Sequence, residues 1–236
     1  MKIAIDVVLL LILIWGIYNG YKRGLVNVLI AVFATCLALF AGSILSSTYS
    51  GTLMPAFEPF VAGLADTVEE QTLTAIGYGN SVVNMNDLIQ QQPEMKQKYC
   101  KALYMEMGIH EGRAEVIAEE AAQLVDAKDM KLENAAVQML SEKLLYVLGT
   151  ALATILILVL FTALVNLEHV SFHLPNGEKV EKVGGVIVGI LLAVLIATLI
   201  CWFLSFFGGF LGKDTLTETY LGRVFLKLTF LTDWLL

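Results

Sequence analysis

Charged residues are scarce in this sequence, and their scarcity argues against a soluble globular fold. Lys, Arg, Asp and Glu make up 16% of the 236 residues and hydrophobic residues 57%, whereas soluble domains average about 25% charged and about 45–50% apolar residues. Three long stretches carry no charge at all: residues 24–57, 144–167 and 183–212. A helix needs about 20 apolar residues to cross the bilayer core, so each stretch is long enough to span a membrane.

Motifs for catalysis and nucleotide binding are also absent. The sequence has no Gly-x-Ser-x-Gly nucleophile elbow and no Gly-x-x-x-x-Gly-Lys-[Ser/Thr] phosphate loop. Its three cysteines, Cys36, Cys100 and Cys201, are too few for a disulfide framework. A net charge of −7 and a pI near 5.0 disfavour nucleic-acid binding. We therefore predict a non-enzymatic protein with no catalytic residues, no cofactor and no nucleic-acid partner.

The histidines do not form a convincing metal site. His110-Glu111 lacks the second histidine that the zinc-protease motif His-Glu-x-x-His requires. His169 and His173 are four residues apart, but two histidines under-coordinate zinc, and Pro175 indicates that the helix is ending there. We interpret this pair as interfacial polar residues and predict no metal site.

The apolar runs predict an all-α polytopic membrane protein with four transmembrane helices. The spans are expected at about residues 3–18, 25–46 and 144–167, with the fourth beginning near residue 183. A cleaved signal peptide is the alternative for the first span, but no small-x-small cleavage site follows Tyr18, and the next apolar run begins within a few residues. We therefore expect the first span to be retained.

Between the second and third spans, residues 48–142 have a different composition. They contain fifteen Asp or Glu and six Lys or Arg, a net charge of −9. Apolar residues at helical spacing predict three amphipathic helices: one up to Gly108, one from about Arg113, and one from about Lys131 that continues into the third span. The expected apolar positions are Met95, Tyr99, Leu103 and Met107; Val116, Ile117, Ala121, Leu124 and Val125; and Leu132, Ala136, Met139 and Leu140.

The last residues of the chain predict an amphipathic helix on the membrane surface, with packing against the helix bundle as the alternative. Its apolar side would contain Leu216, Tyr220, Val224, Leu228, Leu231 and Leu235. The predicted organisation is therefore a transmembrane hairpin (1–47), an acidic helical extramembrane subdomain (48–142), a second transmembrane hairpin (143–212) and an amphipathic interfacial tail (213–236).

Glycines four residues apart predict where the transmembrane helices pack closely. Gly16, Gly20 and Gly24 lie on one helix face, and so do Gly185 and Gly189. The polar residues inside the spans are hydroxyls and amides, which normally bond to a neighbouring helix or to their own backbone. An ion-coupled transporter usually keeps an ionisable group near the bilayer centre, and the second, third and fourth spans have none there.

Charges near the short loops predict the orientation. Lys22 and Arg23 lie in the first short loop, and Lys179 and Lys182 lie in the last. Because positive residues in short loops favour the cytoplasmic side, the acidic subdomain is expected outside. Asp6 is close enough to the start of the first span to lie at the membrane interface.

Two segments also carry a family resemblance. Ile5-Asp6-Val7-Val8, with Gly20-Tyr21-Lys22-Arg23-Gly24-Leu25 after a long apolar helix, forms an amino-terminal hairpin pattern. Val180-Glu181-Lys182-Val183-Gly184-Gly185, continuing to Gly189, begins the last span. Both segments resemble the colicin V production (CvpA) family of bacterial inner-membrane proteins. Glu181-Lys182 stands where members often have Asp-Arg, Leu191-Leu192 stands where a basic residue is often found, and residues 48–142 are longer than in compact members.

The resemblance implies a function carried by partners rather than by a defined reaction. It implies a polytopic membrane protein linked to toxin production or export and to maintenance of the cell envelope. The expected partners are the lipid bilayer, other membrane or envelope proteins and further copies of the chain. An oligomeric small channel or transporter, with hydroxyl-bearing helix faces lining the path, is the alternative function.

Overall fold

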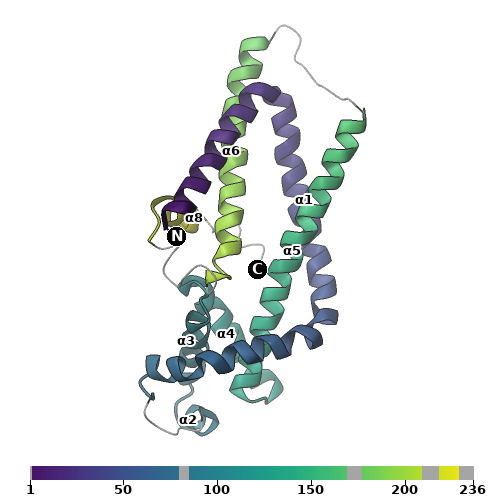
Figure 1. Cartoon of the computed structure of the whole chain (residues 1–236). Coiled ribbons are helices and arrows are strands. Elements are labelled where there is room, and N and C mark those ends of the chain that lie inside the picture. The colour runs from purple at the N-terminus through teal and green to yellow at the C-terminus, as the bar shows by residue number, and fades with distance from the viewer. Residues whose placement is uncertain (1, 80–84, 169–176, 209–217, 229–236) are drawn as a thin grey trace. The chain divides into compact units, whose positions relative to one another are not determined.

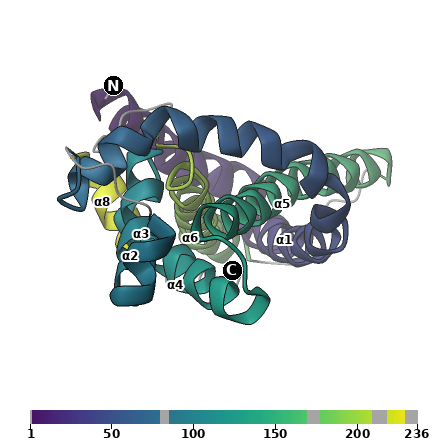
Figure 2. The ribbon, with the colours of Figure 1, turned by 90° about the horizontal axis from the view of Figure 1, so that it is seen from below.

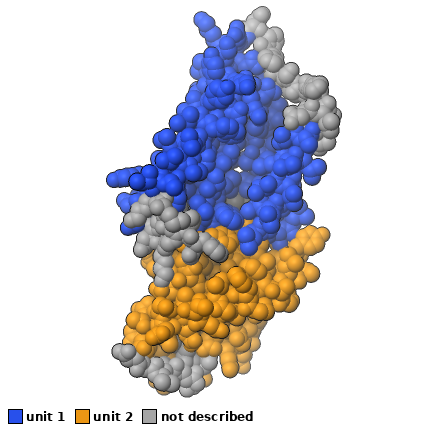
Figure 3. All heavy atoms as spheres, viewed as in Figure 1, with its two compact units in different colours: residues 1–46, 148–204, 215–236 blue, residues 47–147, 205–214 orange. Residues whose placement is uncertain are grey.

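The computed structural model describes residues 2–79, 85–168, 177–208 and 218–228. In these ranges the regular structure is helical, which confirms the predicted all-α class. The chain divides into two compact units, coloured separately in Figure 3. Unit 1 comprises residues 1–46, 148–204 and 215–236, and unit 2 comprises residues 47–147 and 205–214.

Three of the described helices are long and apolar enough to cross a membrane: α1 (Lys2–Ala75), α5 (Leu132–Glu168) and α6 (Glu178–Leu204). Long apolar helices of the kind predicted from the sequence are therefore present. Helix α6 ends at Leu204, before the uncharged sequence ends at residue 212.

Helix α1 is interrupted at Gly24, where the backbone adopts φ 80° and ψ 168°. This combination is open almost only to glycine, because a Cβ atom would clash with the backbone. The helix reverses its direction here (Figure 1). We call residues 22–24 the elbow of α1.

The helices of unit 1 carry small residues inside and large apolar residues outside. On α5, five exposed positions share one face because they recur three and four residues apart: Leu152, Ile155, Leu156, Val159 and Leu160. Helix α6 buries Gly185, Gly189, Ala193, Ala197 and Thr198. A face of large exposed apolar side chains is costly in water and suits lipid.

Helix α8 (Tyr220–Lys227) is the described part of the predicted amphipathic tail. It packs against α6, and Phe225 joins a buried cluster with Leu9, Ala197 and Cys201. Tyr220 and Val224, on the predicted apolar side, are exposed. The tail helix therefore packs on the bundle through one side and presents apolar side chains on another.

In unit 2, helix α1 continues to Ala75, well past the expected end of the second span at residue 46. Pro55 and Pro59 lie inside the helix rather than ending it. Each proline removes a backbone hydrogen bond and crowds the preceding turn, which bends a helix without requiring it to stop. The blue part of α1 bends visibly in Figure 1. The helix ends just before Gly77, which has φ 91°.

The remaining helices of unit 2 are α2 (Met85–Gln91), α3 (Met95–Glu106), α4 (Glu111–Lys128) and the first part of α5. Three of them, α3, α4 and the start of α5, lie where amphipathic helices were predicted, whereas α2 was not predicted. Helices α3 and α4 lie side by side (Figure 2), and α5 runs from the acidic region into the apolar stretch without interruption. Gly108, at φ 90°, follows the end of α3 as expected.

The core of unit 2 contains most of the predicted apolar positions. These include Met95, Tyr99, Leu103, Ile117, Ala121, Val125, Leu132, Ala136 and Leu140. Val116 is the wrong prediction, because its side chain is 42% exposed. The buried side of α4 contains Ile117 and the residues three and four positions from it, such as Ala114 and Ala121. Val116 is next to Ile117 in the chain and therefore lies on another side of the helix.

Candidate functional site

The predicted glycines bring the part of α1 before the elbow against α6 within unit 1. A Cβ atom on Gly16 would lie 2.5 Å from the Ala193 Cβ and 2.6 Å from the Gly189 carbonyl oxygen. A Cβ atom on Gly20 would collide with the Gly185 carbonyl oxygen and would lie 2.9 Å from the Gly185 carbonyl carbon. Only glycine allows the two backbones to approach so closely.

The elbow rests on Glu181, which lies in the first turn of α6. A Cβ atom on Gly24 would lie 2.8 Å from the Glu181 Cγ and 2.9 Å from its Oε1. Glu181 is only 8% exposed, and its Oε1 atom has no hydrogen-bond partner. After the elbow, the Asn27 side-chain amide donates to the Arg23 carbonyl oxygen at 2.8 Å.

Lys22, Arg23 and Lys182 do not share one role. Lys22 and Arg23 have exposed side chains in the elbow. Lys182 donates to Glu178 at 2.7 Å on its own helix, and its ammonium lies 5.8 Å from the centroid of the Tyr21 ring. This distance is within the range of a cation–π contact, so Lys182 links the start of α6 to the chain beside the elbow.

Asp6 has a local structural role that the sequence did not predict. Its carboxylate accepts hydrogen bonds from the backbone N–H groups of Tyr220, at 3.1 Å, and Leu221, at 2.9 Å. These two groups are in the first turn of α8 and have no partner within that helix. Asp6, on α1, therefore caps α8. A negative charge near a helix N-terminus stabilises the helix through its dipole.

The part of α1 after the elbow contacts α5 through small and hydroxyl-bearing residues. A Cβ atom on Gly42 would lie 2.6 Å from the Thr154 hydroxyl, and one on Gly149 would lie 2.5 Å from the Ser46 hydroxyl. The Thr154 hydroxyl reaches the Ala38 carbonyl oxygen at 3.5 Å. The Thr150 hydroxyl is buried without a hydrogen-bond partner.

Other hydroxyl groups of the apolar helices bond to their own backbone, as the sequence predicts. Thr35 donates to the Ala31 carbonyl oxygen at 2.8 Å, and Thr198 donates to that of Val194 at 2.9 Å. Such bonds satisfy the hydroxyl without a partner helix.

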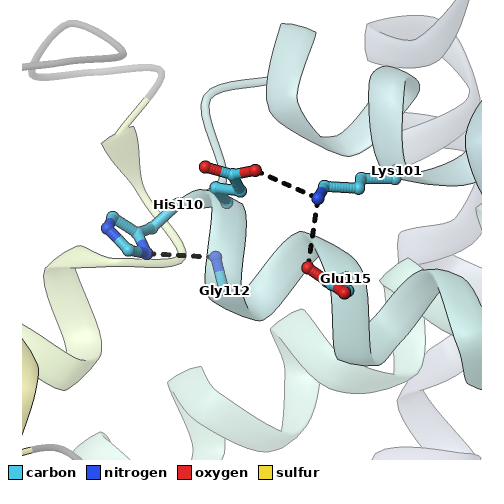
Figure 4. Close-up of polar contacts among 5 residues, drawn as sticks. Lys101, His110, Gly112 and Glu115 are labelled. Atoms are coloured by element: carbon cyan, nitrogen blue, oxygen red, sulfur yellow. Dashed lines mark hydrogen bonds and ion pairs between the residues drawn. The ribbon is translucent and has the colours of Figure 1, made fainter.

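In unit 2, His110 caps the N-terminus of α4 (Figure 4). Its Nδ1 accepts from the Gly112 backbone N–H at 3.3 Å. Burial, and then the nearby Arg113 charge, lower the pKa of His110, and the Glu111 carboxylate opposes them. The neutral form is the one that can accept this bond, so the cap and the lowered pKa act together.

Lys101 joins α3 to the first turns of α4 (Figure 4). Its ammonium lies 3.0 Å from a Glu111 oxygen and 3.1 Å from a Glu115 oxygen. These hydrogen bonds raise the pKa of Lys101. All three side chains are partly exposed, so the contribution of these pairs to stability is small.

The remaining candidate groups are the histidines and the cysteines. No cluster of three or more His, Cys, Asp or Glu side chains is placed to hold a metal ion there. His169 and His173 lie outside the described residues. Cys100 is fully buried, and burial raises the pKa of its thiol to about 12.

Comparison with known proteins adds no family assignment. No family model, no curated protein and no solved structure matches this chain.

Proposed function

We propose that this chain is a non-enzymatic integral membrane protein of the colicin V production type. Its four transmembrane helices would be α1 before the elbow, α1 after the elbow, α5 and α6. The glycine contact of Gly16 and Gly20 with Gly185 and Gly189 carries this proposal. In lipid, burial of apolar surface gives no net drive for helix association, so helices associate through such close backbone contacts.

The proposed role is to hold the acidic helical subdomain as a docking surface in the bacterial inner membrane. The partners would act in toxin production or export, or in maintenance of the envelope. The support is the exposed side of α4, which carries Glu111, Glu115 and Glu119 over a well-packed core. A charged surface on rigid helices favours a protein partner over a small substrate.

Substitution of Gly20 by leucine tests this proposal in cells. Gly51→Leu is the matched control, because an added Cβ there meets nothing within 4 Å. We expect Gly20→Leu to lower membrane abundance and to reproduce the phenotype of a deletion strain, whereas Gly51→Leu should not. Normal abundance and phenotype for Gly20→Leu would exclude the packing role.

The proposed orientation needs a reporter other than the native cysteine of unit 2, since Cys100 is buried. Glu119 is exposed on α4, so Glu119→Cys provides an accessible thiol. Labelling of this variant by an impermeant thiol reagent in intact cells is expected if the acidic subdomain lies outside. Labelling only after permeabilisation would reverse the orientation.

An oligomeric small channel is the second candidate, favoured by one observation. The Thr150 hydroxyl of α5 is buried without a partner. Ser46 and Thr154 lie where α1 contacts α5. Ion or solute flux through liposomes containing the purified protein separates the two functions. A docking protein should give no flux above empty liposomes, and a channel should give flux that Thr150→Val reduces.

A further inference from the structure

One side of α1 in unit 2 carries large apolar side chains that are exposed. Four residues there are 38–60% exposed: Tyr49, Leu53, Phe60 and Leu64. We call these four residues the α1 patch. They lie four, seven and four positions apart, so helical spacing places them on one face. Another side of the same segment is buried, as Val61 and Ala65 show, and the patch is therefore separate from the core of unit 2.

The polar side of the same segment is acidic. Asp66, Glu69 and Glu70 are exposed, and the sequence contains no Lys or Arg between residues 24 and 95. An amphipathic helix binds a membrane surface by burying apolar side chains and, where it carries Lys or Arg, by attraction to anionic lipids. This segment lacks the second contribution, so only its apolar side chains can supply a favourable contact with lipid.

The uncharged stretch of α1 after the elbow is too long for a bilayer core. Residues 25–57 are helical and carry no charge, and at about 1.5 Å per residue they extend about 50 Å. The hydrocarbon core is about 30 Å thick, and even a helix tilted by about 40° fits only about 40 Å of its length into it. The end of this stretch must therefore lie outside the core.

Pro55 and Pro59 let the end of this stretch stay close to the bilayer. On a straight helix, Phe60 would lie about 20 Å beyond residue 46, whereas the headgroup region extends only about 5–8 Å beyond the core on each side. Both prolines lie inside α1, and the helix bends in this part (Figure 1). The bend falls between the two halves of the patch, so both halves can meet the same surface.

We propose that the α1 patch lies in the headgroup region of the bilayer, so that this part of unit 2 rests on the lipid surface. The inference rests on the proposed membrane insertion of α1. Its aromatic residues, Tyr49 and Phe60, suit this depth, because a tyrosine ring places its apolar body in lipid and its hydroxyl in water. Since the polar side is acidic, the contact does not require anionic lipids.

A lipid surface fits the patch better than a second copy of the chain. Ile44 and Leu45, at the end of the second span, are 51% and 43% exposed and precede Tyr49 by one turn. The patch therefore continues the apolar surface that faces lipid in the proposed function. A second copy packed on the patch would bring its acidic side close to that of the first, and like charges oppose such an association.

Nitroxide labels on single cysteines test the inference in the full chain, reconstituted into phosphatidylcholine liposomes. Cys36→Ala removes the exposed native thiol, and the two buried cysteines stay in place. Labels on Phe60→Cys and Leu64→Cys report on the patch. The matched control is Asp66→Cys, an exposed position on the acidic side of the same helix. A label on Leu152→Cys, 62% exposed on α5, reports separately whether the proposed spans lie in lipid.

Relaxation of each label is measured with oxygen, which concentrates in lipid, and with a water-soluble nickel chelate. We expect oxygen to reach the labels at positions 60, 64 and 152 and the nickel chelate to be largely excluded from them. The label at position 66 should be severalfold more accessible to the nickel chelate.

Nickel access at positions 60 and 64, with position 152 protected, would overturn the inference and leave the proposed membrane insertion intact. Nickel access at position 152 would overturn the proposed function as well. Protection of the patch from both reagents, with spin–spin broadening between chains, would show that a second copy covers it and would also overturn the inference.

Discussion

Substitution of Gly20 by alanine is the smallest change that tests how α1 meets α6. The added methyl group would collide with the Gly185 carbonyl oxygen and would also lie 2.9 Å from the Gly185 carbonyl carbon and 3.1 Å from the Val186 Cα. All three are backbone atoms of α6, which cannot rotate away as a side chain does. The two helices must separate, or the chain must bend.

Helix propensity and overpacking act in opposite directions on the free energy of unfolding of Gly20→Ala. Alanine is favoured over glycine inside a helix by about 1 kcal/mol. Overpacking of a tightly packed contact costs about 1–3 kcal/mol. The net result for Gly20→Ala should therefore be a destabilisation of up to about 2 kcal/mol. Gly63→Ala, where an added Cβ meets nothing within 4 Å, should show only the favourable helix term.

Reversible unfolding in detergent measures both variants, and a double-mutant cycle with Gly185→Ala sharpens the result. Once one methyl group has separated the helices, the second enters a widened gap. The double variant should therefore lose less stability than the sum of the two single variants. Equal stability of Gly20→Ala and Gly63→Ala, or strict additivity in the cycle, would refute the close approach of the two backbones.

Three further predictions concern local contacts. Asp6→Ala should speed hydrogen exchange at the start of α8 by weakening a cap worth about 1 kcal/mol, with Asp6→Asn intermediate; unchanged exchange would contradict the cap. His110 has a lowered pKa in the folded chain, so its contribution to stability is present above its ordinary pKa of about 6.5 and is lost as the pH falls through the lowered value. His110→Asn, which caps without titrating, should remove that part of the pH dependence of exchange in α4; a dependence that persists would assign it elsewhere. Cys100, with its pKa near 12, should resist thiol reagents until denaturant is added, and rapid labelling of the native chain would show that unit 2 opens.

The spacing of apolar residues predicted most of the helices. In unit 2 apolar side chains are buried at helical intervals, and in unit 1 large apolar side chains are exposed at helical intervals. In unit 2, Tyr99, Leu103 and Ile117 are buried where the helical pattern puts them. The continuation of α1 beyond residue 46 was missed for a physical reason. The change in composition at residue 48 predicts a new region there, but Pro55 and Pro59 lie inside α1, and a proline can bend a long helix without ending it.

The individual contacts of the site are less predictable, because they join residues far apart in the sequence. Gly16 and Gly20 mark a close approach, but the sequence does not say which helix approaches them. The capping role of Asp6 depends on backbone groups more than 200 residues away. His110 is an uncommon capping residue, so its position before α4 gives no recognised start signal.

Glu181 is the clearest case in which sequence and structure together say more than either alone. In the sequence it precedes Lys182 and follows Glu178 by three residues, so a solvated charge pair is the simplest interpretation. In the structure Lys182 pairs with Glu178, and the elbow covers Glu181. Gly24 makes this possible, because a Cβ atom at that position would meet the Glu181 side chain. The glycine that reverses α1 is therefore the same residue that accommodates the buried carboxyl group, and the two features should fail together in Gly24→Ala.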